Sequence, residues 1–315
     1  MSDCSVIVPV YKNEANVPAL LERLAALHRS VAGGIEAVCV VDGSPDASYR
    51  LLAEALPRAP HASRLLLLSR NFGSFAAIRE GMRVAAGRWF AVMAADLQEP
   101  QELVEQFFAA LRNDEADIVV GTRAGRADGV ADRAAANAFW SIYRRLVNPE
   151  LPPGGVDIFG CNRAFRDRLV EFGEAHSSLI GQIFWLGFRR KTIAYTRAAR
   201  DAGVSAWTFS RKMKYLSDNV FAFSDLPIKV FLALGFLGLG TSIVVGAAVI
   251  VGRLSHAWDA PGYAATMIAI LFFGSLNLFA LGIMGSYVWR AYENTKGRPL
   301  AVVMRDERFE PKTRA

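Results

Sequence analysis

Short apolar runs alternate with amphipathic stretches over the first 120 residues of this chain. The apolar runs predict strands at residues 5–10, 36–42, 65–69, 89–94 and 117–121, and the amphipathic stretches predict helices near 17–28, 47–56, 75–86 and 100–112. Strands that alternate with helices favour an α/β fold, with a mostly parallel sheet covered by helices on both faces. Ligands bind such sheets at the carboxyl ends of the strands, so the residues that follow each strand are the candidates for function.

Two later apolar runs are much longer. Residues 230–252 and 263–289 contain no charged side chain, and each exceeds the roughly 20 residues that cross a bilayer. A buried helical hairpin in a soluble protein is the competing interpretation, but globular helices seldom stay apolar on every face for this length. The runs therefore predict two transmembrane helices, joined by a linker too short to hold a domain.

The flanking charges predict the orientation of this hairpin. Basic residues precede the first span and follow the second, whereas the linker contains Arg253 alone. The positive-inside rule then places both termini in the cytoplasm, and the location expected for the protein is the inner cell membrane.

The predicted organisation has four parts. Residues 1–210 form a cytoplasmic catalytic domain, 211–226 a juxtamembrane amphipathic helix, 227–290 the transmembrane hairpin, and 291–315 a cytoplasmic tail. The juxtamembrane helix either lies in the membrane interface or packs on the α/β domain. The tail has a strand-like segment at 300–304, which either folds back on the α/β domain or stays mobile.

Composition narrows the class of partner. Hydrophobic residues make up 52% of the chain and the formal net charge is +6. The basic residues gather toward the first span, which favours anionic lipid or phosphate over nucleic acid. Neither a G-x-G-x-x-G nor a G-x-x-x-x-G-K-[ST] motif follows a predicted strand, which argues against dinucleotide oxidoreductases and P-loop enzymes.

Four strand-end segments carry a family resemblance. PVYKNE at 9–14, VVDGSPD at 40–46, SRNFG at 69–73 and ADLQEP at 95–100, followed by two spans, resemble the polyprenyl-phosphate glycosyltransferases of family 2. These enzymes have a GT-A (Rossmann-like) nucleotide-sugar-binding domain. The resemblance implies transfer of a sugar, with inversion, from a nucleotide sugar to a polyprenyl phosphate at the cytoplasmic membrane face, for cell-envelope glycans.

The resemblance also implies the donor site. Its expected substrate-binding residues are Pro9, Tyr11, Glu14, Asp42, Ser44, Arg70 and Asn71. A carboxylate such as Asp42 suits the hydrogen-bond donors of a base or ribose, although Asp-Gly-Ser is also an ordinary turn sequence.

A divalent metal ion, Mg²⁺ or Mn²⁺, is implied at Asp96 and Gln98. The family's D-x-D signature has lost its first carboxylate here, because Ala94 occupies that position. Magnesium is often held by one or two carboxylates plus substrate phosphates, so Asp96 with the donor is a sufficient set. The competing interpretation is that Asp96 caps the helix beginning near Pro100.

The acceptor site is implied by Asp157, which falls where the family has an acidic residue, and by Arg197 and Arg200, whose charges suit a phosphate. A phosphate monoester is largely a dianion at neutral pH, so Asp157 is not needed as a simple base. Its alternative role is that of a turn residue.

Two other functions are weighed against this one. A processive polysaccharide synthase is disfavoured because the chain has no Q-x-x-R-W motif. A noncatalytic membrane protein that binds nucleotide sugars is motivated by Ala94. Self-association is also expected, since two spans make a thin membrane domain and glycines lie along the first.

Overall fold

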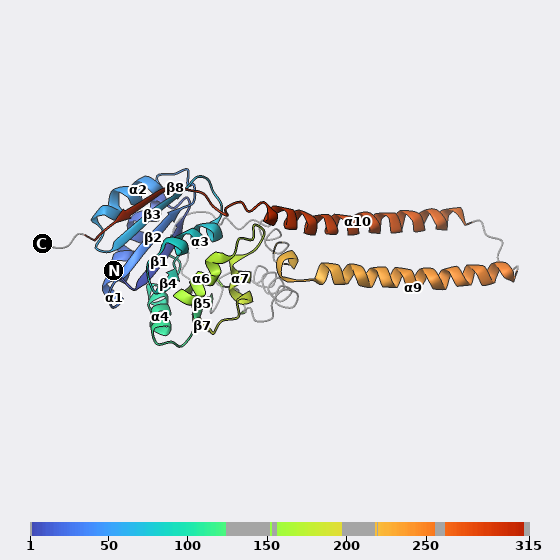
Figure 1. The fold of residues 1–315 in the computed structure, drawn as a ribbon, viewed down its shortest axis with the longest axis horizontal. Coiled ribbons are helices and arrows are strands. Elements are labelled where there is room, and N and C mark those ends of the chain that lie inside the picture. The colour runs from blue at the N-terminus through green and yellow to red at the C-terminus, as the bar shows by residue number, and fades with distance from the viewer. Residues whose placement is uncertain are drawn as a thin grey trace.

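The structure, a computed structural model, describes residues 2–123, 152, 156–196, 218, 220–255 and 262–311. Its centre is an eight-stranded sheet with the order β7-β5-β6-β4-β1-β2-β3-β8 (Figure 1). The strands are β1 Cys4–Val10, β2 Ile35–Val41, β3 Ala62–Leu68, β4 Trp89–Val92, β5 Ile118–Arg123, β6 Phe159–Asn162, β7 Arg190–Tyr195 and β8 Val303–Phe309. The five predicted strands are present, and their boundaries differ from the predicted ones by at most three residues.

Most neighbouring strands are parallel, as predicted. The exceptions are β6, which runs antiparallel between β4 and β5, and β8, which runs antiparallel to β3. Strands β1 to β5 and β7 therefore end at one edge of the sheet, while β6 and β8 begin there. This common edge, called the carboxyl edge below, brings the predicted site residues together.

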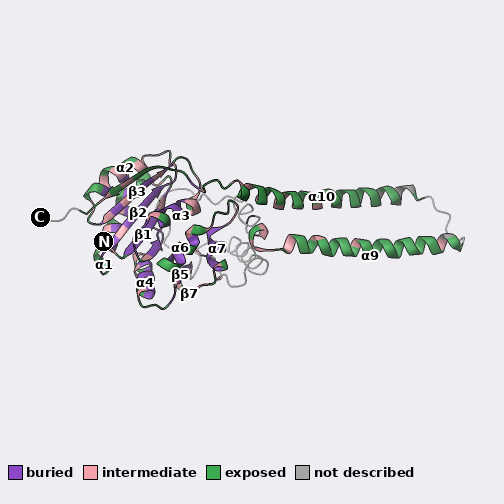
Figure 2. Cartoon of the chain, in the orientation of Figure 1, coloured by how far each residue is buried: buried purple, intermediate pink, exposed green. Residues whose placement is uncertain are grey.

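Helices cover both faces of the sheet. Helix α1 (Val17–Ser30) contacts α2 (Ser48–Ala55) and α4 (Gln101–Arg112), whereas α3 (Ser74–Val84) contacts α6 (Arg163–Glu171). A short helix, α7, spans Leu179–Trp185. Figure 2 shows the buried residues concentrated in the sheet and on the inner sides of these helices. The largest fully buried side chains are phenylalanines, among them Phe90, Phe107 and Phe165.

Two long helices extend from the α/β domain as a hairpin (Figure 1). Helix α9 covers Leu226–Leu254 and α10 covers Tyr263–Thr295, so both continue beyond the predicted spans at the ends near the α/β domain. Each has a 27-residue segment that is long and apolar enough to cross a membrane, Leu226–Gly252 and Ala269–Thr295. Figure 2 shows that nearly all of their surface is exposed, which is the expected state of residues that contact lipid.

The base of the hairpin is fastened to the α/β domain. The Arg290 guanidinium donates to Asp218 Oδ1 at 2.7 Å and to the His176 carbonyl at 3.3 Å, and the Ala175 N–H donates to Asn294 Oδ1 at 3.1 Å. The Phe221 ring packs edge-on against Tyr287 with centroids 5.1 Å apart. The hydrogen bonds to residues 175 and 176 hold the C-terminal end of α10 against the segment between α6 and α7.

The described part of the juxtamembrane helix packs on the α/β domain. The Phe223 ring lies so close to Gly181 of α7 that an added Cβ at Gly181 would be 2.3 Å from it. This contact supports packing on the α/β domain, rather than a position in the membrane interface, for residues 218 and 220–223. The helix also ends at residue 223, before α9 begins at Leu226, and the predicted residues 211–217 lie outside the described part.

The tail folds back on the α/β domain. Strand β8 pairs with β3, with Asp306 opposite Leu66. The Arg64 guanidinium also forms a bidentate ion pair with the Asp306 carboxylate, at 2.5 and 2.7 Å. The Tyr49 hydroxyl donates to Glu307 at 2.5 Å. The predicted strand at 300–304 was therefore placed about three residues too early, because the observed strand is largely charged.

Candidate active site

The strand order reverses direction next to β1, which has β2 on one side and β4 on the other. Pairing of β1 with β2 continues to Val10 and Val41, but pairing with β4 ends at Ile7 and Val92. Pro9 lies beyond this last pair, where its missing N–H removes no ladder bond to β4. In open α/β sheets ligands bind where the order reverses, so the loops after β1 and β4 are the expected site.

The loop after β1 is tied to the loop after β2. Ser44 Oγ accepts from the Lys12 N–H at 2.8 Å and donates to Asp46 Oδ1 at 2.6 Å. The Glu14 carboxylate accepts from the Ala47 N–H at 2.8 Å, at the start of α2. Glu14 and Ser44 thus hold the loops in place, while the Tyr11 side chain is 40% exposed beside them. Their contact with a substrate stays a prediction.

Asp42 anchors the SRNFG loop. Its two carboxylate oxygens accept from the N–H groups of Phe72 and Gly73 at 2.7 and 2.8 Å, and its side chain is buried. Burial raises the pKa of this carboxyl, and the two backbone hydrogen bonds together with Arg70 partly offset that effect. Asp42 is therefore more than a local turn residue, since it joins two segments 30 residues apart. Each oxygen keeps a second lone pair that a base or ribose could use.

Glycine is required at position 43 by this arrangement. Its φ is +56°, and a Cβ there would be 2.2 Å from the Arg70 carbonyl carbon. The close approach brings Arg70 and Asn71 next to the loop after β2, and the Asn71 amide donates to the Asp42 carbonyl at 3.5 Å. The Arg70 guanidinium stacks on the Phe72 ring at 4.2 Å, which holds an exposed cation at the carboxyl edge.

Asp96 lies in the loop after β4, directly before a strained residue. Leu97 has φ +55° and Lys12, in the loop after β1, has φ +54°. Left-handed conformations of bulky residues cost on the order of 1–2 kcal/mol each and cluster at functional sites. Asp96 is not the cap of α4, because the N-cap position is Pro100. That competing interpretation of Asp96 is wrong.

Two further residues with side-chain oxygens follow Asp96 closely in the sequence. Gln98 and Glu99 are buried in the same loop. Within the described ranges, no group of three His, Cys, Asp or Glu side chains is arranged to hold a metal ion. A carboxylate and an amide oxygen suit Mg²⁺ or Mn²⁺, which leave most of their coordination positions to phosphates and water.

Asp157 belongs to a cluster that the sequence did not indicate. Its carboxylate forms a bidentate ion pair with Arg123, at 2.5 and 2.8 Å, and accepts from the Tyr195 hydroxyl at 2.6 Å. Arg123 ends β5 and Tyr195 ends β7, and the two are partners in the register of these strands. Burial and the charges of Asp157 and Glu99 raise the pKa of Tyr195, so its hydroxyl stays protonated as a donor.

Arg123 and Tyr195 were missed because nothing near them in the sequence marks them. The available signal was the position of Arg123 at the end of a predicted strand. The expected acceptor residues Arg197 and Arg200 lie outside the described part of the chain, so the structure does not test them.

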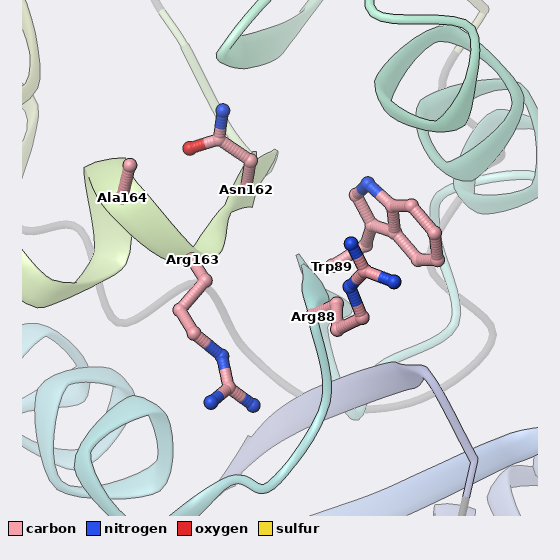
Figure 3. A pocket seen from close by; sticks show the side chains of 5 residues that line it. All are labelled: Arg88, Trp89, Asn162, Arg163 and Ala164. Carbon is pink, nitrogen blue, oxygen red and sulfur yellow. The ribbon is translucent and has the colours of Figure 1, made fainter.

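A pocket among the described residues lies elsewhere. It has a volume of about 450 Å³ and is lined by Arg88, Trp89, Asn162, Arg163 and Ala164 (Figure 3). Trp89 begins β4 and Asn162 ends β6, so this pocket lies at the edge of the sheet opposite the predicted site. None of the predicted site residues lines it.

Comparisons with known proteins identify the family of this chain. Residues 5–173 match the family model "Glycosyl transferase family 2". An uncharacterized glycosyltransferase of Synechocystis sp. is 30% identical over 302 residues, which cover 96% of this chain and 94% of that protein. The SfII prophage-derived bactoprenol glucosyl transferase of Shigella flexneri is 26% identical over 308 residues, which cover 98% and 99% of the two chains.

A solved structure of a mannosyltransferase from Pyrobaculum calidifontis, in complex with GDP-Man and Mn²⁺, is 18% identical. The match covers 93% of this chain and 87% of that one, with a TM-score of 0.47. The family match spans the strands and loops in which Asp42, Asp96 and Asp157 lie, and it covers more than half of the chain. The chain therefore belongs to glycosyltransferase family 2.

Proposed function

We propose that this glycosyltransferase moves a sugar from a nucleotide sugar to a polyprenyl phosphate, giving a polyprenyl-phosphate sugar. One observation carries the proposal: the carboxyl edge adjoins the base of the hairpin. The Ser69 N–H, at the end of β3, donates to the Val302 carbonyl at 2.9 Å, and Val302 follows the end of α10 by seven residues. The SRNFG loop therefore lies where a phosphate anchored in the membrane could reach it.

The donor is assigned to the loops after β1, β2 and β4. Asp42 accepts from the base or ribose, and Tyr11 supplies a flat apolar wall. Asp96 and Gln98 would hold Mg²⁺ or Mn²⁺, which neutralises charge on the diphosphate as it leaves. Arg70, stacked on Phe72, adds a fixed positive charge at the same edge.

The acceptor is assigned to the cluster of Asp157, Arg123 and Tyr195. The Arg123 guanidinium is planar and bidentate toward Asp157, and the same geometry fits a phosphate. The acceptor phosphate is already a dianion, so its oxygen attacks the anomeric carbon directly. One C–O bond forms, the bond to the nucleoside diphosphate breaks, and the configuration inverts.

The membrane placement is part of the proposal. The described helices α9 and α10 are both long enough to span, and all the flanking basic residues except Arg253 lie at the ends near the α/β domain. We assign both termini to the cytoplasm and the protein to the inner membrane. The bactoprenol named in the Shigella relative supports a lipid acceptor at such a membrane.

Ala94 favours a second candidate, a noncatalytic protein that binds nucleotide sugars. Its half-buried methyl group stands where a second carboxylate would strengthen metal binding. The Ala94→Asp variant separates the two candidates. If donor phosphates already complete the metal site, this variant should gain little turnover. If the site has decayed, turnover should rise from an undetectable level.

The direct test is a transfer assay with the full chain in lipid bilayers, undecaprenyl phosphate, Mg²⁺ or Mn²⁺, and a panel of nucleotide sugars. Lipid-linked sugar is expected with at least one donor, and a chelator should abolish it. Asp96→Asn should lower turnover at least about 100-fold, as loss of a main transition-state contact does. Glu54→Gln, an exposed carboxylate on α2, is the matched control. Nucleotide-sugar binding without any transfer would favour the second candidate.

A further inference from the structure

One face of α10 carries a repeat that is separate from its contact with α9. Positions on this face recur at alternating steps of four and three, which is the spacing of a coiled-coil seam. They are Ile270, Gly274, Asn277, Leu281, Met284 and Val288. The four large apolar side chains of this seam are each 61% to 66% exposed, and nothing lies within 4 Å of the position of a Cβ at Gly274.

Helix α9 packs against a different face. The contacts between the two helices include the Phe231 and Phe279 rings, 5.4 Å apart, and the Phe273 ring, 3.4 Å from a Cβ built on Gly238. Neither Phe273 nor Phe279 belongs to the seam. The hairpin therefore leaves the seam facing outward along its whole length.

Exposure of Asn277 on this outward face is energetically unfavourable in a bilayer. It is the only carboxamide residue in the two predicted spans, and its side chain is exposed, with no hydrogen bond to any described residue. Thr241 and Ser275, by contrast, donate to the carbonyls of Leu237 and Leu271 one turn earlier. A carboxamide without a partner in hydrocarbon costs several kcal/mol.

The depth of Asn277 follows from the helix rise. At about 1.5 Å per residue, roughly 21 Å separate it from Tyr263, where α10 begins, and roughly 20 Å separate it from Arg290, which binds the α/β domain. A hydrocarbon core about 30 Å thick that lies anywhere between the levels of Tyr263 and Arg290 therefore includes the level of Asn277.

We propose that the seam of α10 is the contact surface for α10 of a second copy of this chain. Two copies inserted in the same direction place their helices in parallel, so Asn277 meets Asn277 at the same depth. A carboxamide has both donors and an acceptor and is complementary to itself. Gly274 lets the two backbones approach closely at that level. The inference rests on the proposed membrane placement, but not on the reaction.

Cysteine cross-linking in native membranes tests the surface. Leu281→Cys lies on the seam, and Leu278→Cys, which is 73% exposed, lies off it. The natural residues Cys4, Cys39 and Cys161 are buried and free, so they give little background. Oxidation should produce a covalent dimer of Leu281→Cys but not of Leu278→Cys. Equal cross-linking at both positions, or none at Leu281→Cys, overturns the proposal.

Removal of the carboxamide tests its role. Asn277→Leu should raise the dissociation constant of the dimer, measured by energy transfer in bilayers, by roughly 3- to 15-fold. Ser275→Ala, which removes a polar group from the opposite side of α10, should leave it unchanged. An unchanged constant in Asn277→Leu overturns the assignment.

Two further measurements on the same membranes show whether the seam, the membrane placement or the proposed reaction is at fault. Protein released from them by alkaline carbonate would overturn both the membrane placement and the seam. Cross-linked protein that transfers no sugar would overturn only the proposed reaction.

Discussion

Both carboxylate oxygens of Asp157 accept hydrogen bonds from the Arg123 guanidinium, and one of them also accepts from the Tyr195 hydroxyl. The pair is about one-fifth exposed, so water reaches it and its net contribution to stability is small. In the proposed reaction this ion pair serves geometry rather than stability, because the planar Arg123 guanidinium orients both the Asp157 carboxylate and an incoming acceptor phosphate.

Arg123→Lys should therefore lower transfer more than it lowers stability. A lysine keeps the charge but cannot form the two parallel hydrogen bonds, so we expect kcat/KM for the lipid acceptor to fall about 10-fold or more. KM for the nucleotide sugar should hardly change. The transfer assay and the thermal unfolding midpoint of the same preparation measure the two effects. Equal loss toward both substrates would assign Arg123 to general folding instead.

His61 is a titratable group far from the site. Its side chain is 1% exposed and packs beside His28, with ring centroids 5.9 Å apart, and Nδ1 lies 2.9 Å from Ser63 Oγ. Burial lowers the pKa of His61 to about 4, against an ordinary value of about 6.5. The unfolded chain thus binds the proton more readily than the folded chain does.

Stability should consequently fall as the pH drops from about 6.5 toward 4. The loss between pH 7 and pH 5 amounts to about 2 kcal/mol from this group. Thermal unfolding midpoints at the two pH values should differ less in His61→Asn than in the natural chain. His176→Asn, a change to a histidine near the base of the hairpin, is the control, and an identical pH dependence in all three proteins would contradict the assignment to His61.

At the scale of elements, β8 completes the sheet at the edge next to β3. Its sequence, VMRDERF, is mostly charged, and the ion pair between Arg64 and Asp306 replaces much of the apolar contact of an ordinary strand. Asp306 is partly exposed, so a surface-like contribution of at most about 1 kcal/mol is expected.

Asp306→Ala should loosen β8 without unfolding the sheet. Amide hydrogen exchange in β8 is expected to accelerate by up to roughly fivefold, since local opening needs less free energy when the pair is absent. Exchange in β1 and β2 should stay as slow as before. Glu310→Ala, an exposed carboxylate just after the strand, is the control. Unchanged exchange in Asp306→Ala would show that the backbone ladder alone holds the tail.

These elements also show how far sequence reasoning reaches. The alternation of apolar runs and helices predicted β1 to β5, and their common edge brought Glu14, Ser44 and Asp42 together with Arg70 and Asn71. Strands β6 and β8 were missed or misplaced, because FGCN and VMRDERF lack the apolar pattern of a strand and depend on partners far along the chain. Arg123 and Tyr195 meet only through the β5–β7 pairing, so no local pattern could predict their contact with Asp157.

At the scale of the whole molecule, the short helix that leads into the hairpin packs on the α/β domain, where the Phe223 ring meets Gly181. Gly181→Ala places a methyl group where the Phe223 ring now lies, and overpacking of this kind costs about 1–3 kcal/mol. We expect a lower unfolding midpoint and a lower rate of transfer to the membrane acceptor.

Phe223→Ala supplies the control for this contact. Phe223→Ala alone should weaken the packing of this segment. When it is combined with Gly181→Ala, the lost ring leaves space for the new methyl group. The double variant should then be less destabilised than the sum of the two single variants. Simple additivity would show that the two residues do not meet in the folded protein.

The position of β8 at the end of the chain also sets an order of events during synthesis. The ribosome makes β3 first and its partner β8 only after both helices of the hairpin, so one edge of the sheet stays open while α9 and α10 are being made. An open edge next to the leucines of β3 is a template for wrong pairing. Closure of this edge by β8 therefore comes only after the whole hairpin has been made and its two ends have been brought back together at the α/β domain.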